Sequence, residues 1–401
     1  MSTKRKFWIN DMEAITYIMF ILIIIGTINI CSASLITAYT NFENPYFFLV
    51  RHLLSFVIGF IAFIFACRFN YKRLQNWIPM LIVITVICLV LVLLVGITVN
   101  GSRRWLPLGF MQFQPSEIAK IVTIIISASY LGQCLDHNVP ITINPQKNIV
   151  FLLCVLIAGL VEAQPDMGTA LIILGIPTIM YFLAGLSKKW IGIICGAGLV
   201  LFVFLATFQP YRLDRINSWY DPWSRAQGDG YQIVQSILAI GSGEFSGMGL
   251  GHGFSKYSYL PESHTDFAFA VFCQELGFLG AFIIFALLIT MAYYCTKIAL
   301  NTKDNFGKML VCGIMMLIVG QAASNMAMVI GLVPVVGVPL PFISYGGTSL
   351  ILNMLSIGLV LSVERKNRAK STPQKIDSVP SPQKTTMPKP IKRKGHLYRL
   401  K

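Results

Sequence analysis

One carboxylate in this sequence stands where a polar run meets an apolar segment. Asp266 ends the run Pro261–Asp266, and the apolar segment begins at Phe267. A carboxylate at such a boundary is poorly solvated, so its pKa is easily perturbed, and charge kept there is often functional. Asp266 is therefore the candidate catalytic base, which would take a proton from an attacking hydroxyl. His264 is a minor second candidate, because a histidine in such a loop is more often structural.

Cationic residues near the ends of other apolar segments supply the second half of the predicted site. Arg51, Arg104 and Lys120 are predicted to face the same side of the membrane. Such a patch suits a diphosphate, which accepts several charge-assisted hydrogen bonds. Glu117 is included as a substrate-binding candidate, but its i,i+3 spacing to Lys120 is equally consistent with a simple intrahelical ion pair. The combination favours group transfer from a lipid-linked phosphate, with the cations stabilising the departing diphosphate.

The composition indicates an all-α polytopic membrane protein. Of 401 residues, 55% are hydrophobic and only 12% are charged, with a mean hydropathy of +0.68. Soluble domains carry about 25% charged residues. Runs near the ~20 residues that a helix needs to cross a bilayer predict ten transmembrane helices. They are 15–35, 47–67, 77–99, 118–135, 149–161, 169–186, 191–208, 267–294, 309–333 and 350–363.

The distribution of Lys and Arg predicts the orientation of these helices. One set of loops holds twelve of these residues and the C-terminal tail another twelve, whereas the opposite loops hold six. Because cytoplasmic loops carry the excess of positive charge, both termini are predicted to be cytoplasmic. A large extracytoplasmic loop, residues 209–265, then lies between the seventh and eighth helices. It is too long for a simple connector.

Two compositional units divide the chain. Residues 1–363 form the predicted ten-helix domain, and residues 364–401 form a tail with twelve Lys or Arg and two acids. The basic, proline-rich tail is predicted to be disordered and held near anionic lipid headgroups. Nucleic acid is not an expected partner, because the tail has almost no interleaved aromatic residues. The nine cysteines are scattered singly, which gives no support for disulfides or structural zinc.

Several motifs, in order along the chain, carry a resemblance to a known family. They are Gly101–Trp105, Phe113–Glu117, Gln164–Ala170, Gly230–Ser236, Tyr259–Phe267 and Pro341–Gly347. Through them the chain resembles the SEDS family of bacterial cell-wall polymerases, of the FtsW, RodA and SpoVE types, from about Ile15 to Lys366. The segments Asp221–Trp223 and Gly249–Gly251 are most like the FtsW type, which acts in cell division.

The resemblance implies a ten-helix peptidoglycan glycosyltransferase in the bacterial cytoplasmic membrane, at the division septum. It would polymerise lipid II into glycan strands at the outer face and release polyprenyl diphosphate. Asp266 matches the family's essential loop aspartate, and Arg51, Arg104, Glu117 and Lys120 fall at charged positions of its central cavity. The resemblance also implies a divalent metal ion, Mg²⁺ or Mn²⁺. Expected partners are a class B penicillin-binding protein and other divisome membrane proteins.

Other functions remain open from the sequence. One is a RodA-type polymerase of cell elongation. Another is a flippase for lipid-linked oligosaccharides, which performs no chemistry and needs a charged path through the bilayer. The cytoplasmic halves of most predicted helices carry almost no charge. A scaffold for the crosslinking enzyme is a third possibility, and it gives no reason to keep Asp266, Arg51 and Lys120 at the outer boundary.

Overall fold

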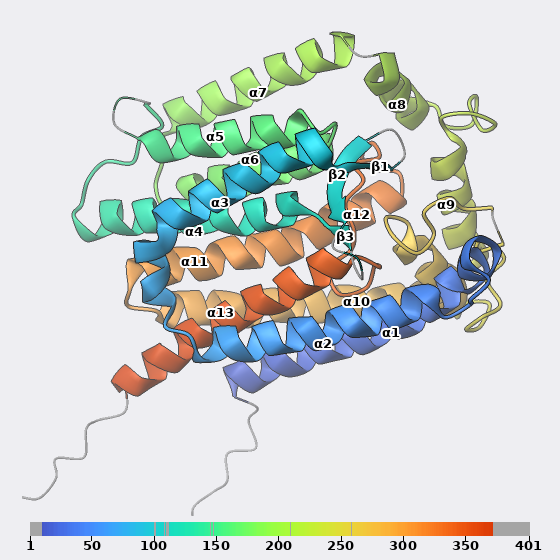
Figure 1. Cartoon of the computed structure of the whole chain (residues 1–401), viewed down its shortest axis with the longest axis horizontal. Helices are drawn as coiled ribbons and strands as arrows, with labels where there is room; N and C mark the ends of the chain where they lie inside the picture. The colour runs from blue at the N-terminus through green and yellow to red at the C-terminus, as the bar shows by residue number, and fades with distance from the viewer. Residues whose placement is uncertain are drawn as a thin grey trace, which may run out of the picture.

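The computed structural model describes residues 10–371, except positions 100, 101, 108, 110, 111, 145, 147, 209 and 258, and it is a bundle of helices (Figure 1). The helices are α1 (Asp11–Phe42), α2 (Phe47–Arg68), η1 (Tyr71–Arg73), α3 (Leu74–Val95), α4 (Pro115–Asp136), α5 (Ile149–Glu162), α6 (Met167–Leu183), α7 (Lys188–Phe208), α8 (Pro210–Tyr220), α9 (Tyr231–Ser242), α10 (Ala268–Asn301), α11 (Asn305–Met315), the π-helical turn η2 (Met316–Gly320), α12 (Gln321–Val329) and α13 (Gly347–Ser371).

Seven segments are long and apolar enough to cross a membrane among the residues that the structure describes. They are α1, α2, η1 with α3, α4, α10, α11 through α12, and the α13 segment Gly347–Ala369. The apolar helices α5 and α6 are shorter. The chain is therefore a multi-pass helical membrane protein, as its composition predicts.

The sequence-based prediction of an all-α chain needs one correction. A small antiparallel sheet, in the order β1-β2-β3, lies between α3 and α4. Its strands are β1 (Ile97–Val99), β2 (Ser102–Pro107) and β3 (Gln112–Phe113). Strand β2 carries Arg104, so the sheet fixes the position of one candidate site residue.

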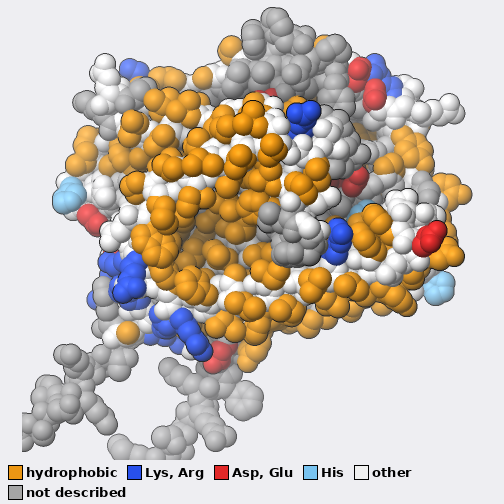
Figure 2. All heavy atoms as spheres, in the orientation of Figure 1, with side chains coloured by type: hydrophobic (Ala, Val, Ile, Leu, Met, Phe, Trp, Pro, Cys, Tyr) orange, Lys and Arg blue, Asp and Glu red, His pale blue; other side chains and the backbone are white. Residues whose placement is uncertain are grey.

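The helices bury their interior polar groups and leave apolar side chains outside. Helices α4 and α13 are the most enclosed of the long segments, whereas α2, α3 and α10 expose many large apolar side chains. Figure 2 shows apolar side chains over much of one face. Such a surface suits lipid contact, because a lipid-facing helix needs no polar face. Helices α2 and α13 pack so closely that a Cβ at Gly358 would lie 2.7 Å from the Phe63 carbonyl oxygen.

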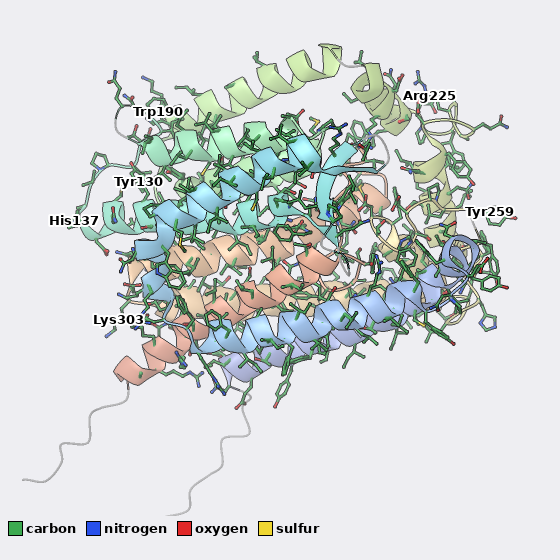
Figure 3. All side chains as sticks on the ribbon, in the orientation of Figure 1. Tyr130, His137, Trp190, Arg225, Tyr259 and Lys303 are labelled. Atoms are coloured by element: carbon green, nitrogen blue, oxygen red, sulfur yellow. The ribbon has the colours of Figure 1, made fainter. Side chains whose placement is uncertain are left out.

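The bundle has two distinct ends. Tyr130, His137, Trp190 and Lys303 lie at one end, whereas Arg225 and Tyr259 lie at the other (Figure 3). We call the first the terminal end, because α13 finishes there (Figure 1). We call the second the loop end, because it carries α8, α9 and the segment that leads to Asp266.

The predicted boundary of the C-terminal tail also needs correction. Helix α13 continues past Val363 to Ser371, so the first eight residues assigned to a disordered tail are helical. The i,i+4 ion pair between Arg368 and Glu364, at 2.7 Å, supports this extension. Residues 372–401 of the predicted tail lie outside the described residues.

The eighth predicted membrane helix is interrupted. Gly277 has φ 64° and ψ −163°, which breaks α10 into two parts. A Cβ at Gly247 would lie 2.2 Å from the Glu275 carbonyl oxygen, and one at Gly243 would lie 2.1 Å from that of Cys273. These glycines of the long loop therefore permit close backbone packing against the first part of α10. Packing is the simpler of the two interpretations that the glycine-rich sequence allowed.

Candidate functional site

Asp266 lies just before α10, in a backbone segment that side chains from two other helices hold in place. Asn325 of α12 donates from its amide nitrogen to the carbonyl oxygen of Asp266 at 2.8 Å. Asn29 of α1 donates in the same way to the carbonyl of Ala268 at 3.0 Å. Gly337 stands beside the carboxyl group, and a Cβ there would lie 3.5 Å from Oδ2. The tertiary structure therefore fixes the backbone at Asp266.

The surroundings of Asp266 raise its pKa to about 7. Desolvation by burial is the main cause, and the carboxylates of Glu262 and Asp166 add to it. The guanidinium groups of Arg104 and Arg215 act in the opposite direction. A carboxyl group with a pKa near the working pH is suited to general base catalysis, because it is partly ionised and still basic enough to take a proton.

Arg104 and Asp166 both influence the pKa of Asp266, and their side chains lie beside each other. The Nη1 atom of Arg104 lies 3.7 Å from Oδ1 of Asp166, and its Nη2 donates to the carbonyl oxygen of Pro165. Its Nε is buried and has no partner among the described residues. Asp166 is itself 1% exposed and caps α6 by accepting from the Thr169 amide at 3.3 Å. Gln114 donates to its other oxygen at 3.3 Å.

Three charged residues that shift the pKa of Asp266 were missed as site residues from the sequence: Glu262, Asp166 and Arg215. Asp166 was noted only within a motif that breaks a helix and carries the family resemblance. An acid inside such a motif, between two apolar segments, was the signal that could have identified it. Arg215 lies on α8 and donates to the Val335 carbonyl at 2.9 Å. No sequence pattern distinguished it from the other basic residues of the long loop.

Glu117 and Lys120 form a buried ion pair. The ammonium group lies 2.7 Å from the carboxylate, with side-chain exposures of 1% for Lys120 and 5% for Glu117. Lys120 also donates to Gln321 Oε1 at 2.8 Å, and the Gln321 amide donates to the Pro339 carbonyl at 2.9 Å. The pair therefore links α4 to α12 and to the segment before α13. This geometry favours the structural interpretation that the spacing left open.

Arg51 and His264 both lie beside Tyr345, and these three residues form a third cluster of side chains. The guanidinium carbon of Arg51 lies 4.2 Å from the centre of the Phe47 ring, and the positive charge of Arg51 lies near the Tyr345 hydroxyl. The ring of His264 lies 4.4 Å from that of Phe48. Its carbonyl accepts from the Tyr345 amide at 2.9 Å. Because burial lowers the pKa of His264, its imidazole is neutral at neutral pH and packs against aromatic rings.

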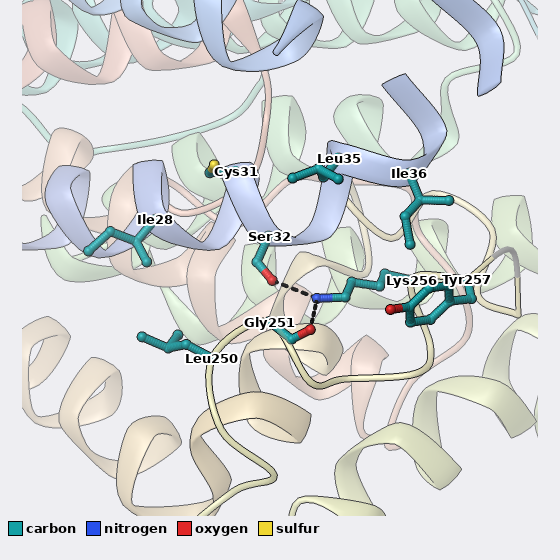
Figure 4. Close-up of a pocket in the computed structure, with 9 residues that line it drawn as sticks. All are labelled: Ile28, Cys31, Ser32, Leu35, Ile36, Leu250, Gly251, Lys256 and Tyr257. Carbon is teal, nitrogen blue, oxygen red and sulfur yellow. Dashed lines mark hydrogen bonds between the residues drawn. The ribbon is translucent and has the colours of Figure 1, made fainter. Parts of the chain in front are cut away.

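A second buried ion pair lies near the loop end, beside a pocket of about 660 Å³ (Figure 4). Lys256 Nζ lies 2.9 Å from Glu275 Oε1, and it donates to Ser32 Oγ at 3.0 Å and to the Gly251 carbonyl at 2.7 Å. These three acceptors match the three protons of an ammonium group. Ser32 in turn donates to Glu275 at 2.6 Å. The network therefore ties the long loop to α1 and α10.

The fold and site together define a polytopic membrane protein with a titratable carboxylate and a cationic group near one end of its bundle. The sequence matches the family described as "Cell cycle protein" (FtsW, RodA, SpoVE) over residues 12–369. The chain belongs to this family.

Named relatives agree with this assignment. The chain is 38% identical to Stage V sporulation protein E of Bacillus subtilis over 355 residues, covering 88% of this chain and 96% of the relative. It is also 38% identical to a probable peptidoglycan glycosyltransferase FtsW of a Geobacter species, covering 87% and 95% of the two chains.

Solved structures share the fold. A chain in a structure titled "Structural coordination of polymerization and crosslinking by a peptidoglycan synthase complex" gives a TM-score of 0.70 at 26% identity, covering 88% of this chain and 97% of that one. The rod shape determining protein RodA of Thermus thermophilus gives 0.65 at 25% identity, covering 88% and 96%.

Proposed function

We propose that this chain is a peptidoglycan glycosyltransferase of the FtsW type. It polymerises lipid II into glycan strands at the outer face of the bacterial cytoplasmic membrane, at the division septum. The observation that carries the proposal is Asp266, whose pKa of about 7 results from burial and from two neighbouring carboxylates. The relatives named peptidoglycan glycosyltransferase FtsW support the choice of reaction.

The mechanism is a displacement in which Asp266 acts as the base. Asp266 accepts the proton of the acceptor sugar hydroxyl as the oxygen bonds to the anomeric carbon of the donor. The bond between that carbon and the diphosphate oxygen breaks, and polyprenyl diphosphate leaves with the electron pair. Arg104 stabilises the departing negative charge, because preorganised cations act where charge develops in the transition state. Its buried Nε, which has no partner within the described part of the chain, offers one such donor.

The other predicted site residues take more limited roles. Arg51 holds its charge next to Tyr345 and is proposed to contact the diphosphate from the side of α2. His264 is proposed to shape the site through its neutral ring. Glu117 and Lys120 neutralise each other, so a direct role in binding requires their ion pair to open. They remain predictions as substrate-binding residues.

The membrane topology is part of the proposal. The helices α5, α6 and α7 each correspond to a segment that the sequence predicts to cross the membrane, and with the seven longer spans they make ten. Ten crossings put both termini on one side, which the Lys and Arg distribution predicts to be the cytoplasm. The loop end with Asp266 is then extracytoplasmic, as lipid II polymerisation requires.

A divalent ion, Mg²⁺ or Mn²⁺, is proposed to accompany the substrate. No group of three His, Cys, Asp or Glu that could hold a metal occurs among the described residues. Mg²⁺ is commonly held by one or two carboxylates together with substrate phosphates. The negative charge of Asp166 repels that of Asp266 and so raises the pKa of Asp266. Asp166 is the carboxylate that could share such a site with the diphosphate, whose charge the ion would neutralise, because Asp266 must stay free to accept the proton.

A class B penicillin-binding protein is the proposed partner, together with other divisome membrane proteins. The support is the likeness to a chain of a peptidoglycan synthase complex whose title joins polymerisation with crosslinking. A polymerase at the septum needs a crosslinking enzyme beside it, because new strands must be joined to the wall.

Polymerisation of labelled lipid II by purified protein, with and without the partner, tests the proposal. Asp266→Asn should lower the rate by about 10²–10⁴-fold, the usual cost of losing a general base. Asp229→Asn is the matched control, because Asp229 is an exposed acid of the same long loop. Normal glycan synthesis by Asp266→Asn would remove Asp266 from the mechanism. Transport of lipid II without polymer formation by the wild-type protein would favour the flippase.

A further inference from the structure

The first part of α10, Ala268–Leu276, is a short helix that begins just after Asp266 and ends at the break at Gly277. We call it the half-helix. In an unbroken helix, the amides of Phe278 and Leu279 would donate to the carbonyls four residues earlier. Because Gly277 has non-helical angles, those two amides and two carbonyls need partners elsewhere.

The long loop supplies partners for all four groups. Two of its amides donate to the carbonyls of Gln274 and Glu275, each at 3.0 Å. Two of its carbonyls accept from the amides of Phe278 and Leu279, at 2.9 and 3.2 Å. The loop residues are, in the same order, Met248, Gly249, Glu244 and Phe245. The backbone of residues 244–249 therefore lies in the break and joins the two parts of α10.

Two adjacent side chains fix the same end of the half-helix to other elements. Gln274 is 0% exposed, and its Oε1 accepts from the amide and the hydroxyl of Ser255 at 3.1 and 2.5 Å. Its Nε2 donates to Oγ of Ser242, the last residue of α9, at 2.8 Å. Glu275 is 1% exposed and forms the buried ion pair with Lys256. The far end of the half-helix is thus held by backbone, neutral and charged contacts.

These contacts lie at the opposite end of the half-helix from Asp266. Asn325 and Asn29 each bond to one carbonyl oxygen at the Asp266 end. Contacts at one end of a helix fix a position, whereas its direction depends on the other end as well. A catalytic group misplaced by about 1 Å can cost about 10²-fold in rate. The direction of the half-helix therefore matters for the reaction.

We propose that Lys256, Gln274 and Glu275 are positioning residues for the Asp266 carboxyl group. They hold the far end of the half-helix against the long loop and so keep the carboxyl group directed at the reacting hydroxyl. This inference rests on the proposed role of Asp266 as the base. Because these residues act on geometry through the half-helix, their loss should lower kcat and leave the KM for lipid II nearly unchanged.

The test is polymerisation of lipid II by the purified full chain. The double variant Lys256→Met with Glu275→Gln removes both charges and so leaves no isolated buried ion. Its kcat, per folded protein, should fall by about 10- to 100-fold, with the KM within about twofold of wild type. Ser32→Ala removes one hydroxyl from the same network and perturbs folding less. Its kcat should fall in the same direction by a smaller factor.

The matched control is Lys72→Met with Asp304→Asn. It also removes an ion pair between distant segments, but this pair lies at the terminal end, where it links η1 to the start of α11. The control should lose thermal stability and keep the wild-type kcat per folded protein. An equal fall in kcat in the control would overturn the positioning role, because general loosening of the bundle would then explain the effect. A wild-type kcat in both Ser32→Ala and the double variant would overturn it as well.

Amide hydrogen exchange on the same samples separates this inference from the proposed function. Amides of residues 268–276 should exchange at least about tenfold faster in the double variant than in the wild type, and at the wild-type rate in the control. Unchanged exchange in the double variant would overturn the inference. A wild-type protein that forms no polymer would instead overturn the proposed function, and faster exchange would still support the contacts that hold the half-helix.

Discussion

Lys120→Met would leave a carboxylate without its counter-ion inside the bundle. Glu117 and Lys120 are 5% and 1% exposed at their side chains, with 2.7 Å between the charged groups. Removing one partner of a buried ion pair typically costs about 3–5 kcal/mol, because the remaining charge stays desolvated. Since folded domains are stable by only about 5–15 kcal/mol, we expect a large fall in the thermal unfolding midpoint.

Two double variants distinguish the effect of an isolated charge on stability from the effect of changed side-chain shape. Glu117→Gln combined with Lys120→Met removes both charges and should recover most of the stability, because no isolated ion remains. The charge swap Glu117→Lys with Lys120→Glu keeps the pair but places a carboxylate opposite Gln321 Oε1. Gln321 must then turn its amide and give up its bond to the Pro339 carbonyl. The swap should therefore lower the free energy of unfolding by about 1–3 kcal/mol more than the same swap would in an exposed ion pair.

The assay is thermal unfolding of the purified protein in detergent, with lipid II binding measured on the same samples. The structural interpretation predicts that Lys120→Met loses stability and that binding falls only as folded protein is lost. A Lys120→Met protein as stable as wild type, with weakened lipid II binding, would refute it. Lys120 would then be a phosphate ligand, together with Arg51 and Arg104.

Three further predictions concern orientation, backbone packing and pH. Cysteine labelling should reach Lys188→Cys only from the cytoplasm and Ser224→Cys only from outside, and the reverse pattern would overturn the proposed topology. Gly247→Ala should lower the free energy of unfolding by at least about 2 kcal/mol, because its Cβ meets the Glu275 carbonyl at 2.2 Å and its φ is +82°; an unchanged denaturation midpoint would contradict this. Asp266 holds its proton in the folded state up to about pH 7, so stability should fall between about pH 4 and about pH 7, and less steeply in Asp266→Asn; equal slopes in thermal unfolding would contradict this.

Much of the helical framework was predictable because hydrophobic length is a strong local signal. Most of each apolar run is helical, and α2 begins at Phe47, as predicted. The end of the predicted helix 77–99 is instead strand β1, and the predicted helix 309–333 is divided into α11, η2 and α12. The break at Gly277 was not predictable, since a single glycine in an apolar run does not indicate a chain reversal or kink. The sheet that carries Arg104 was missed because its strands are only two to six residues long.

The sequence indicated Asp266 and Arg104, but it did not indicate Glu262, Asp166 and Arg215, and it did not predict the pairings. The position of Asp266 at an apolar boundary was sufficient to predict a perturbed pKa, because desolvation is the main cause of the rise. The partners of Arg104 and Lys256 depend on contacts between segments far apart in sequence. Such contacts leave no periodicity or spacing in a single chain. From the sequence, Lys256 and Glu275 are therefore interpreted as two separate charges, one in a loop and one in a helix, although they form an ion pair.

The pH dependence of lipid II polymerisation tests the role of Asp266 most directly. If Asp266 is the base, kcat/KM should rise about tenfold per pH unit below about pH 7 and level off above it. Asp166→Asn removes one of the carboxylates that raise the pKa of Asp266, so it should move the midpoint of this profile to lower pH. A profile that is flat between about pH 5 and about pH 8, or a midpoint that Asp166→Asn leaves unchanged, would contradict the assignment of Asp266 as the general base.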